Sequence, residues 1–392
     1  MKAKDILKQE KELAFKNFTN EDAYLIASIL IEQIKERALQ NIRIRIVYRN
    51  EMIYQYLMDG KHGEIWLDRK QKTIETFQHS GYYLFLENEE KKTYEQYLND
   101  ESLVICGGSF PLIVDNDYAG CFLVSGLAHD QDHQLIVEAL RKYQHRKALA
   151  SDIDGTLYFH ELAEPYKVND IIAIKEFQKA GHLFGVCSGR PLCHFNDMRK
   201  LNLDFYIATS GAVLLDKHFH IIEDYPMEKE IARDLFERYH NNYGIIVQTN
   251  SLERFYATRQ DFPNQYTYLF QCFTEVREDK IYGMSLVGEN EEEMFQLKQE
   301  LTILYPQLHC FQNKNSIDIV VKECSKGIAI RRMKQLLKVN EMAGIGDSYN
   351  DIPLLKESDY GFSFYHSPHD VKNEAKYLVS DIDEAIHIMM EE

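Results

Sequence analysis

The chain has 392 residues, of which 45% are hydrophobic and 27% charged, and its formal net charge is −17. A prior of about 150 residues per domain predicts two to three domains, and this apolar content can form several cores. The acidity argues against nucleic acid or an anionic membrane as a general partner. Seven cysteines without CxxC spacing, with no signal peptide or membrane-length apolar run, predict a cytoplasmic protein with reduced thiols.

The first 146 residues mix helical and strand patterns. Apolar residues at helical spacing predict helices near 7–18 and 23–34, the second capped by Thr19 or Asn20. Strands are predicted at 42–48 and 52–56, joined by a turn. The segment Asp115-Asn116-Asp117 separates two further strands, 111–114 and 120–124, as a hairpin, and a helix from about Asp132 to Lys142 follows.

Several pieces of this region resemble the haem-degrading-domain (GlcG-like) family, which are small PAS-like or profilin-like α/β proteins. The resemblance covers about residues 5–145 and rests on Trp66 with Arg69-Lys70-Gln71-Lys72, Cys106-Gly107-Gly108-Ser109-Phe110-Pro111, Gly120, Ser125-Gly126-Leu127 and Asp132-His133. It implies a fold more firmly than a function, and it suggests association into homo-oligomers through this domain. His133 is interpreted as a structural donor in preference to a haem ligand. Gly107 and Gly108 are interpreted as allowing close packing in preference to forming a ligand loop.

Acidic residues follow an apolar strand at the start of the second region. In SDIDGTL (151–157), Asp152 and Asp154 lie on the same side of an extended chain, and Gly155 allows a sharp turn. Asp152 is predicted to be a nucleophile and Asp154 a general acid and base. Asp347, in GIGDSYND (344–351), would hold Mg²⁺ together with Asp152 and the Asp154 carbonyl.

Two further motifs would contact phosphate. In CSGR (187–190), Ser188 and the backbone amide groups after it, beginning with Gly189, would hold phosphate oxygens. Lys326 would place a positive charge opposite the aspartates. Arg190 would help to attract an anionic substrate.

SDIDGTL, CSGR, SKG (325–327) and GIGDSYND, in this order, resemble the four motifs of the haloacid dehalogenase (HAD) superfamily, Cof-type phosphatases. The resemblance implies the roles above, and it makes Asn350 and Asp351 supports of the metal or its waters. Where the family usually has Thr-Asn-Gly-Ala, this chain has TSGA (209–212), which places Ser210 and Gly211 near the substrate. It also departs at 361–368, where the sequence is more aromatic.

The expected fold class is α/β, with two domains. Residues 1–146 form the PAS/profilin-like α/β domain. Residues 147–392 form a Rossmann-like HAD core (147–213 and 314–392) with an inserted α/β cap at about 214–313, where strands alternate with helices near 229–239 and 291–304. Doubly wound sheets bind ligands at the carboxyl ends of their strands, where all four motifs lie.

The expected activity is Mg²⁺-dependent hydrolysis of a small phosphorylated metabolite, such as a sugar phosphate, through an aspartyl phosphate. The alternative is a regulatory or scaffold protein whose N-terminal domain binds haem, another ligand or a protein partner.

Two other motifs have simpler interpretations. Cys193 and Arg199 have the spacing of a tyrosine-phosphatase loop, but the glycines of such a loop are missing between them. Asp381, in a partial repeat of the first motif, is predicted to cap a helix.

Overall fold

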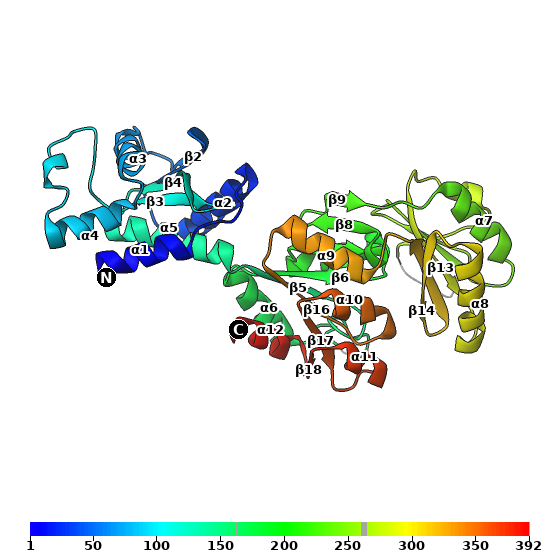
Figure 1. Ribbon diagram of the computed structural model, residues 1–392. Coiled ribbons are helices and arrows are strands. Elements are labelled where there is room, and N and C mark those ends of the chain that lie inside the picture. The colour runs from blue at the N-terminus through cyan, green and yellow to red at the C-terminus, as the bar shows by residue number, and fades with distance from the viewer. Residues whose placement is uncertain (162, 260–264, 392) are drawn as a thin grey trace. The chain divides into compact units, whose positions relative to one another are not determined.

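A computed structural model describes residues 1–161, 163–259 and 265–391. The chain forms two compact units, Met1–His145 and Arg146–Glu392 (Figure 1). Among these residues, no helix combines the length and the apolar character needed to cross a membrane.

The N-terminal unit is a four-stranded antiparallel sheet in the order β2-β1-β4-β3, with helices on both faces. Alternate residues of a strand point to opposite faces, so Ile46 joins the core under α2 and α5 while Val47 packs with Leu67 of α3. The elements are α1 (Ala3–Glu12), α2 (Asn20–Glu36), β1 (Arg43–Tyr48), β2 (Glu51–Leu57), α3 (Ile65–Phe77), α4 (Gly81–Lys91), β3 (Ser109–Val114), β4 (Asp117–Ser125) and α5 (His129–Gln144).

The first helix, predicted near 7–18, is α1 and ends at Glu12, because the chain turns at Leu13 and Phe15 then pairs with Val114 of β3. Three other local predictions for this unit are confirmed. Thr19 caps α2, because its hydroxyl accepts a hydrogen bond from the Asp22 amide. Asp115 and Asn116 both have positive φ, which matches a two-residue hairpin turn between β3 and β4. Gly108 also has positive φ (+97°), and a Cβ there would lie 2.2 Å from Lys70 Nζ, as close packing requires.

Helices α3 and α4 were not predicted from the sequence. Helix α3 buries Lys70 and Thr73 as well as apolar residues. Lys70 Nζ lies 2.8 Å from both Asp132 Oδ2 and the Val124 carbonyl oxygen, and both charged side chains are 3% exposed. A buried lysine that is paired in this way weakens the apolar periodicity from which helices are predicted.

His133 is buried in α5, as expected for a structural role. It is 1% exposed, its Nε2 lies 3.2 Å from Gln9 Oε1, and its ring packs against Tyr82 and Phe110. Burial lowers the pKa of His133 to about 4.

Acid should therefore destabilise the N-terminal unit through His133. The folded-state pKa lies below the unfolded value of about 6.5, so the unfolded state binds the proton first, and stability falls as the pH drops from about 6.5 towards 4. The expected loss between pH 7.5 and pH 5 is about 2 kcal/mol of unfolding free energy. Urea unfolding followed by fluorescence of Trp66, the single tryptophan, reports on this unit. The loss should shrink in His133→Gln, and an unchanged pH dependence in that variant would contradict the assignment.

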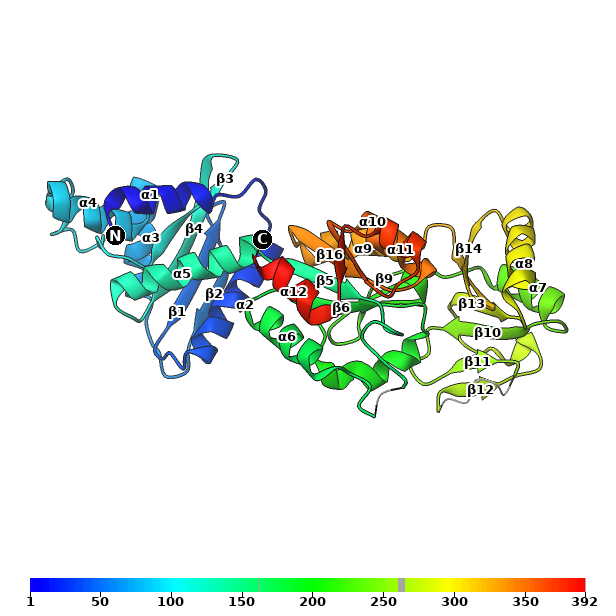
Figure 2. The ribbon, with the colours of Figure 1, turned by 90° about the horizontal axis from the view of Figure 1, so that it is seen from below.

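The core of the C-terminal unit is an eight-stranded sheet in the order β18-β17-β16-β5-β6-β7-β8-β9, parallel from β18 to β7. Helices α6 and α12 cover one face and α9 and α10 the other (Figure 2). Asp381 Oδ1 accepts a hydrogen bond from the Glu384 amide at the start of α12, which confirms the predicted cap. The elements are β5 (Lys147–Ser151), α6 (Val168–Lys179), β6 (Leu183–Cys187), β7 (Phe205–Ala208), β8 (Val213–Asp216), β9 (Ile221–Asp224), α9 (Lys326–Leu337), β16 (Glu341–Ile345), α10 (Ile352–Glu357), β17 (Tyr360–Phe364), α11 (His369–Glu374), β18 (Tyr377–Val379) and α12 (Ile382–Glu391).

The inserted cap is a six-stranded sheet in the order β12-β11-β10-β13-β15-β14, with α7 and α8 packed on one face. Sheet membership moves its edges from the expected 214–313: β8 and β9 belong to the core sheet, and β15 belongs to the cap. The pairing between strands decides which sheet each strand joins, and the sequence pattern does not show which strands pair. The elements are α7 (Lys229–Tyr239), β10 (Gly244–Thr249), β11 (Phe255–Ala257), β12 (Thr267–Leu269), β13 (Ile281–Val287), α8 (Glu291–Leu304), β14 (Leu308–Asn313) and β15 (Ser316–Val321).

Candidate active site

Asp152 follows β5, a central strand of the parallel sheet, and its amide donates to the Ile345 carbonyl at 2.9 Å. This bond ties the end of β5 to the end of β16, which Asp347 follows two residues later. Gly155 has φ of +81°, and a Cβ there would lie 3.0 Å from Asp347 Oδ2. The turn after β5 therefore needs glycine, and it brings the two acidic motifs together.

Three carboxylates cluster at this edge of the sheet. Asp152, Asp347 and Asp351 each offer an oxygen, and these oxygens lie within 4.8 Å of one another. Asp351 Oδ2 accepts from the amides of Asp347 and Ser348 at 3.2 and 3.0 Å. Asp351, expected as an outer support, thus lies in the cluster itself.

Lys326 lies between two of these carboxylates. Its Nζ is 2.6 Å from Asp152 Oδ1 and 2.6 Å from Asp351 Oδ1, and its side chain is 2% exposed. Ser325 caps α9 at this point by accepting from the Ile328 amide, which fixes where Lys326 begins the helix. Although burial lowers it, the charges of Asp152 and Asp351 raise the pKa of Lys326 well above its ordinary value.

The cluster is suited to a hard cation. Burial and the charge of Asp351 raise the pKa of both Asp152 and Asp347, since one lysine does not balance three carboxylates. Asn350 also has a buried Oδ1 without a hydrogen-bond partner among the described residues. Oxygen donors with excess negative charge are what Mg²⁺ prefers.

Asp154 points to different partners. Arg190 donates to both of its oxygens, from Nε at 2.9 Å and from the terminal nitrogen at 2.5 Å, and His160 Nε2 lies 3.0 Å away. Although burial raises it, the bonds from Arg190 and His160 hold the pKa of Asp154 below its ordinary value. The Asp154 carboxylate is therefore ionised in this arrangement, and both of its oxygens accept hydrogen bonds from Arg190.

The loop that was predicted to contact phosphate follows β6. Ser188 is 3% exposed, and its hydroxyl accepts from the Arg190 amide at 3.2 Å. At Gly189, a Cβ would lie 2.9 Å from Asp318 Oδ2 and 3.2 Å from Ser210 Oγ, so no side chain fits. Gly211 has φ of +96° and packs against the Ser325 carbonyl, which connects this loop to the start of α9.

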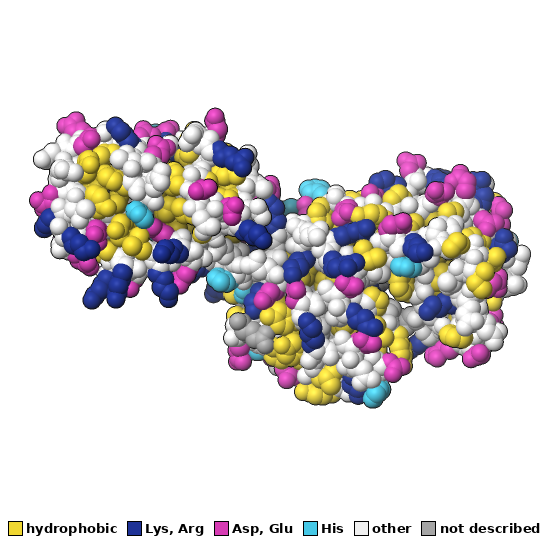
Figure 3. All heavy atoms as spheres, in the orientation of Figure 1, with side chains coloured by type: hydrophobic (Ala, Val, Ile, Leu, Met, Phe, Trp, Pro, Cys, Tyr) yellow, Lys and Arg dark blue, Asp and Glu magenta, His cyan; other side chains and the backbone are white. Residues whose placement is uncertain are grey.

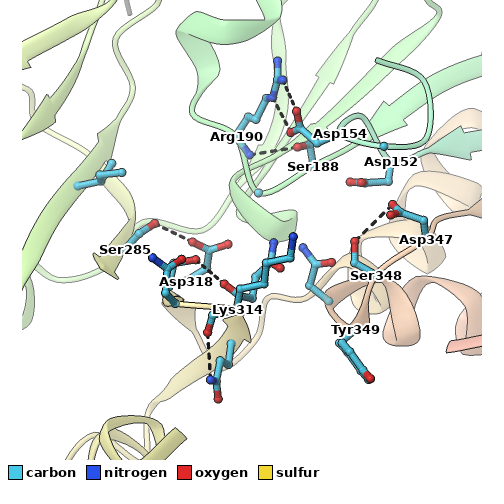
Figure 4. A pocket seen from close by; sticks show the side chains of 18 of the residues that line it. Asp152, Asp154, Ser188, Arg190, Ser285, Lys314, Asp318, Asp347, Ser348 and Tyr349 are labelled. Carbon is cyan, nitrogen blue, oxygen red and sulfur yellow. Dashed lines mark hydrogen bonds and ion pairs between the residues drawn. The ribbon is translucent and has the colours of Figure 1, made fainter. Parts of the chain in front are cut away.

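A pocket of about 1350 Å³ joins these parts. Figure 4 shows it with Asp152 and Asp347 on one side and Ser285 and Asp318 of the cap on the other. Its lining includes Asp152, Asp154, Ser188, Gly189, Arg190, Asp347 and Asn350. Of the other predicted site residues, Lys326 and Asp351 contact this lining from behind, while Ser210 and Gly211 are buried and are not among the lining residues described.

A model of the haloacid dehalogenase-like hydrolases matches residues 149–386. The chain belongs to this family. A second model, of haem degrading HbpS-like proteins, matches residues 18–141. Both resemblances seen in the sequence are confirmed, and the chain joins an HbpS-like domain to a haloacid dehalogenase-like hydrolase.

Relatives of each part support this division. The N-terminal part is 32% identical to a UPF0303 protein of Psychromonas ingrahamii over 142 residues, 35% of this chain and 89% of that protein. The C-terminal part is 25% identical to a Haemophilus influenzae protein described as a candidate phosphatase, over 63% of this chain and 97% of that protein.

Solved structures share the fold of the hydrolase part. A HAD-superfamily phosphatase of Bacteroides thetaiotaomicron has a TM-score of 0.54 at 17% identity, covering 63% of this chain and 96% of its own. A haloacid dehalogenase-like hydrolase of B. subtilis has a TM-score of 0.54 at 20% identity, covering 62% and 98%.

Sequence reasoning missed the hydrolase's cap residues in the pocket. Gln248, Ser285 and Asp318 come from β10, β13 and β15. The available signal was polar residues alternating with apolar ones, as at Ser316 and Asp318 on either side of Ile317. Cys193 is buried, and burial raises its pKa to about 12. A protonated, buried thiol agrees with the prediction that Cys193 and Arg199 do not form a tyrosine-phosphatase loop.

Proposed function

We propose that the C-terminal unit is a Mg²⁺-dependent phosphatase that hydrolyses a small phosphate monoester through an aspartyl phosphate. The observation that carries this proposal is Asp152, a buried carboxylate at the end of β5 that contacts Lys326 and opens onto the pocket. A nucleophile held by a lysine beside an acidic cluster and a phosphate loop is suited to phosphoryl transfer, which depends on positioning and charge neutralisation.

The reaction follows from the roles of these residues. An Asp152 oxygen attacks phosphorus, the bond to the leaving oxygen breaks, and Asp154 gives its proton to the departing alkoxide. Asp154 then takes a proton from water, whose oxygen attacks the aspartyl phosphate, so that inorganic phosphate leaves and the Asp152 carboxylate is restored. To act as an acid, Asp154 must first lose its hydrogen bonds from Arg190 and become protonated. A substrate phosphate that attracts Arg190 would release Asp154 from this pair.

Phosphate oxygens would be bound by Ser188, the Gly189 amide and Lys326, with Arg190 moving to the substrate. Asp152, Asp347 and the Asp154 carbonyl would hold Mg²⁺, with Asp351 and Asn350 completing the site. When bound, the ion would neutralise charge on the transferring phosphoryl group.

The charges of the site itself would attract an anionic substrate. Despite the net charge of −17, lysine and arginine side chains are interspersed with acidic ones over the face of the hydrolase in Figure 3. Because basic and acidic side chains are mixed on the face drawn, we assign the attraction of an anionic substrate to Arg190 and Lys326 at the site. A solved HAD subclass IIB sugar phosphatase shares the fold, with a TM-score of 0.50 at 21% identity, and suggests sugar phosphates as the first substrates to test.

Metal removal tests the proposal. The purified full-length protein is assayed with Mg²⁺ against a panel of phosphorylated metabolites and phenyl phosphate. Chelation should lower turnover to background and Mg²⁺ should restore it, because the clustered carboxylates repel the phosphate dianion without a cation. Ca²⁺ should substitute poorly, since its larger and looser shell would misplace Asp152 relative to phosphorus. A thermal melt in chelator controls for unfolding, and full turnover in excess chelator would disprove the metal site.

The alternative, a regulatory protein whose N-terminal domain binds haem, has less support. It rests on the match to the HbpS-like model, whereas His133 is buried and its Nε2 lies against Gln9. A haem absorbance band after reconstitution would favour it.

A further inference from the structure

Two side chains of the described residues bond to the Asp154 carboxylate, and only one of them lines the pocket. Arg190 is part of the pocket lining, whereas His160 is not among the lining residues described. His160 lines a second cavity, of about 540 Å³, which Asp154 and Arg190 also line. His160 therefore reaches the site only through Asp154.

The two oxygens of Asp154 are held differently. Oδ1 accepts from the terminal nitrogen of Arg190 at 2.5 Å and lies 3.0 Å from His160 Nε2, while Oδ2 accepts from Arg190 Nε at 2.9 Å. An ionised carboxylate only accepts hydrogen bonds, so His160 Nε2 carries the proton and donates it to this bond. A neutral and a charged imidazole can both donate from Nε2, so the bond does not depend on the charge of His160.

The turn after the first acidic motif places His160. The Tyr158 amide donates to the Ile153 carbonyl at 2.7 Å, and the Gly155 amide donates to the Tyr158 carbonyl at 3.0 Å. The His160 ring packs edge to face against the Tyr158 ring, with 4.8 Å between their centres, and the Arg190 guanidinium lies over the same ring at 5.4 Å. Tyr158 therefore supports both partners of Asp154.

The mechanism proposed above takes Arg190 away from Asp154. Figure 4 shows Arg190 beside Ser188, which is proposed to bind phosphate, so a bound phosphate would lie next to Arg190. When Arg190 turns to the phosphate, Asp154 Oδ2 loses the bond from Nε, whereas Oδ1 keeps the bond from His160. Oδ2 is then the oxygen that is free to carry a proton, and the bond at Oδ1 limits rotation of the carboxyl group.

We propose that His160 is a positioning residue, which holds Asp154 in place for proton transfer by donating from Nε2 to Oδ1. This proposal rests on the phosphatase function proposed above. Asp154 Oδ2 would give its proton to the leaving alkoxide and later take one from water. Both steps depend on alignment, because proton transfer is efficient only between groups held in hydrogen-bond geometry. The attack of Asp152 on phosphorus transfers no proton, so it does not need His160.

Kinetics of His160→Ala with two kinds of ester test this role. The value of kcat for the best alkyl monoester of the panel should fall about 10- to 100-fold, with KM within about threefold of the wild type. Release of p-nitrophenolate in the first turnover of p-nitrophenyl phosphate needs no proton, because this anion is a stable leaving group, and it should keep its rate within about threefold. Both rates come from one preparation, so any unfolded fraction cancels in their ratio.

A conservative variant and a matched control accompany this test. His160→Gln should recover most of the lost kcat, because its amide can donate from nearly the position of Nε2. The control is His220→Ala: His220 Nδ1 lies 3.1 Å from Asp216 Oδ2, but neither residue is among the described lining of either cavity. Both of its rates should stay within about threefold of the wild type.

Binding separates positioning from substrate recognition. The alkyl monoester is titrated calorimetrically, with Mg²⁺, into Asp152→Asn with and without His160→Ala. The two dissociation constants should agree within about threefold, because His160 does not line the substrate pocket. Weaker binding in the double variant would make His160 a substrate-binding residue and would overturn the proposal.

The remaining outcomes distinguish the two proposals. If the wild type hydrolyses no phosphate ester with Mg²⁺, the phosphatase function fails, and the role of His160 fails with it. If the wild type is active and His160→Ala keeps its turnover of the alkyl monoester, only the role of His160 is wrong. Equal losses of alkyl turnover and of first-turnover p-nitrophenolate release, or a His160→Gln variant as slow as His160→Ala, would also exclude a positioning bond to Asp154.

Discussion

Replacing Asp152 by asparagine should lower turnover at least about 1000-fold, which is a barrier increase of about 4 kcal/mol. Asparagine keeps the shape of the side chain but lacks the carboxylate that attacks phosphorus. The fold should survive, because Lys326 keeps its contact with Asp351. Steady-state kinetics with Mg²⁺ and circular dichroism measure the two effects.

A control separates the loss of the nucleophile from the loss of a charge. Asp359 is also paired with a lysine, Lys334 at 2.7 Å, in the same unit but outside the pocket lining described. Asp359→Asn should keep near-normal turnover, whereas Asp154→Asn should be nearly inactive because it lacks the general acid. If Asp152→Asn retained more than about a tenth of wild-type turnover, the covalent mechanism would be wrong.

Replacing Lys326 by methionine should destabilise the C-terminal unit by about 3 kcal/mol in chelator and lower turnover at least about 100-fold. The change leaves Asp152 and Asp351 buried without their cation, since each accepts from Lys326 Nζ at 2.6 Å. Mg²⁺ should restore part of the lost stability, because a bound cation neutralises the same carboxylates. Urea unfolding followed by circular dichroism, with chelator and with Mg²⁺, measures both.

The control for this variant is Lys334→Met. Lys334 pairs with Asp359, but both side chains are about one-third exposed, at 33% and 38%. Water screens such a pair, so the expected loss is below about 1 kcal/mol and independent of Mg²⁺. Equal losses in the two lysine variants would mean that the buried cluster does not depend on Lys326.

The sequence by itself predicted both families and the α/β fold, and it predicted several local structures. The Asp115-Asn116 turn and the Thr19 cap depend on residues within a few positions of each other, so the local sequence decides them. It also predicted that the acidic motifs meet, because residues after neighbouring parallel strands share one edge of the sheet, and Asp152 and Asp347 do lie together. Their catalytic roles stay predictions.

Only the tertiary structure decided which side chains contact one another across the chain. The sequence predicted that Lys326 lies opposite the aspartates, but only the structure shows that its Nζ bonds to both Asp152 and Asp351. The bond from Arg190 to Asp154 was not predicted, because no local pattern reports a pair 36 positions apart. The edges of the cap depended on strand pairing, and the direction of Gln248, Ser285 and Asp318 towards the pocket depended on which sheet face α7 and α8 cover. A strand alternates polar and apolar residues in the same way whether its polar face meets solvent or a pocket, and only packing distinguishes the two.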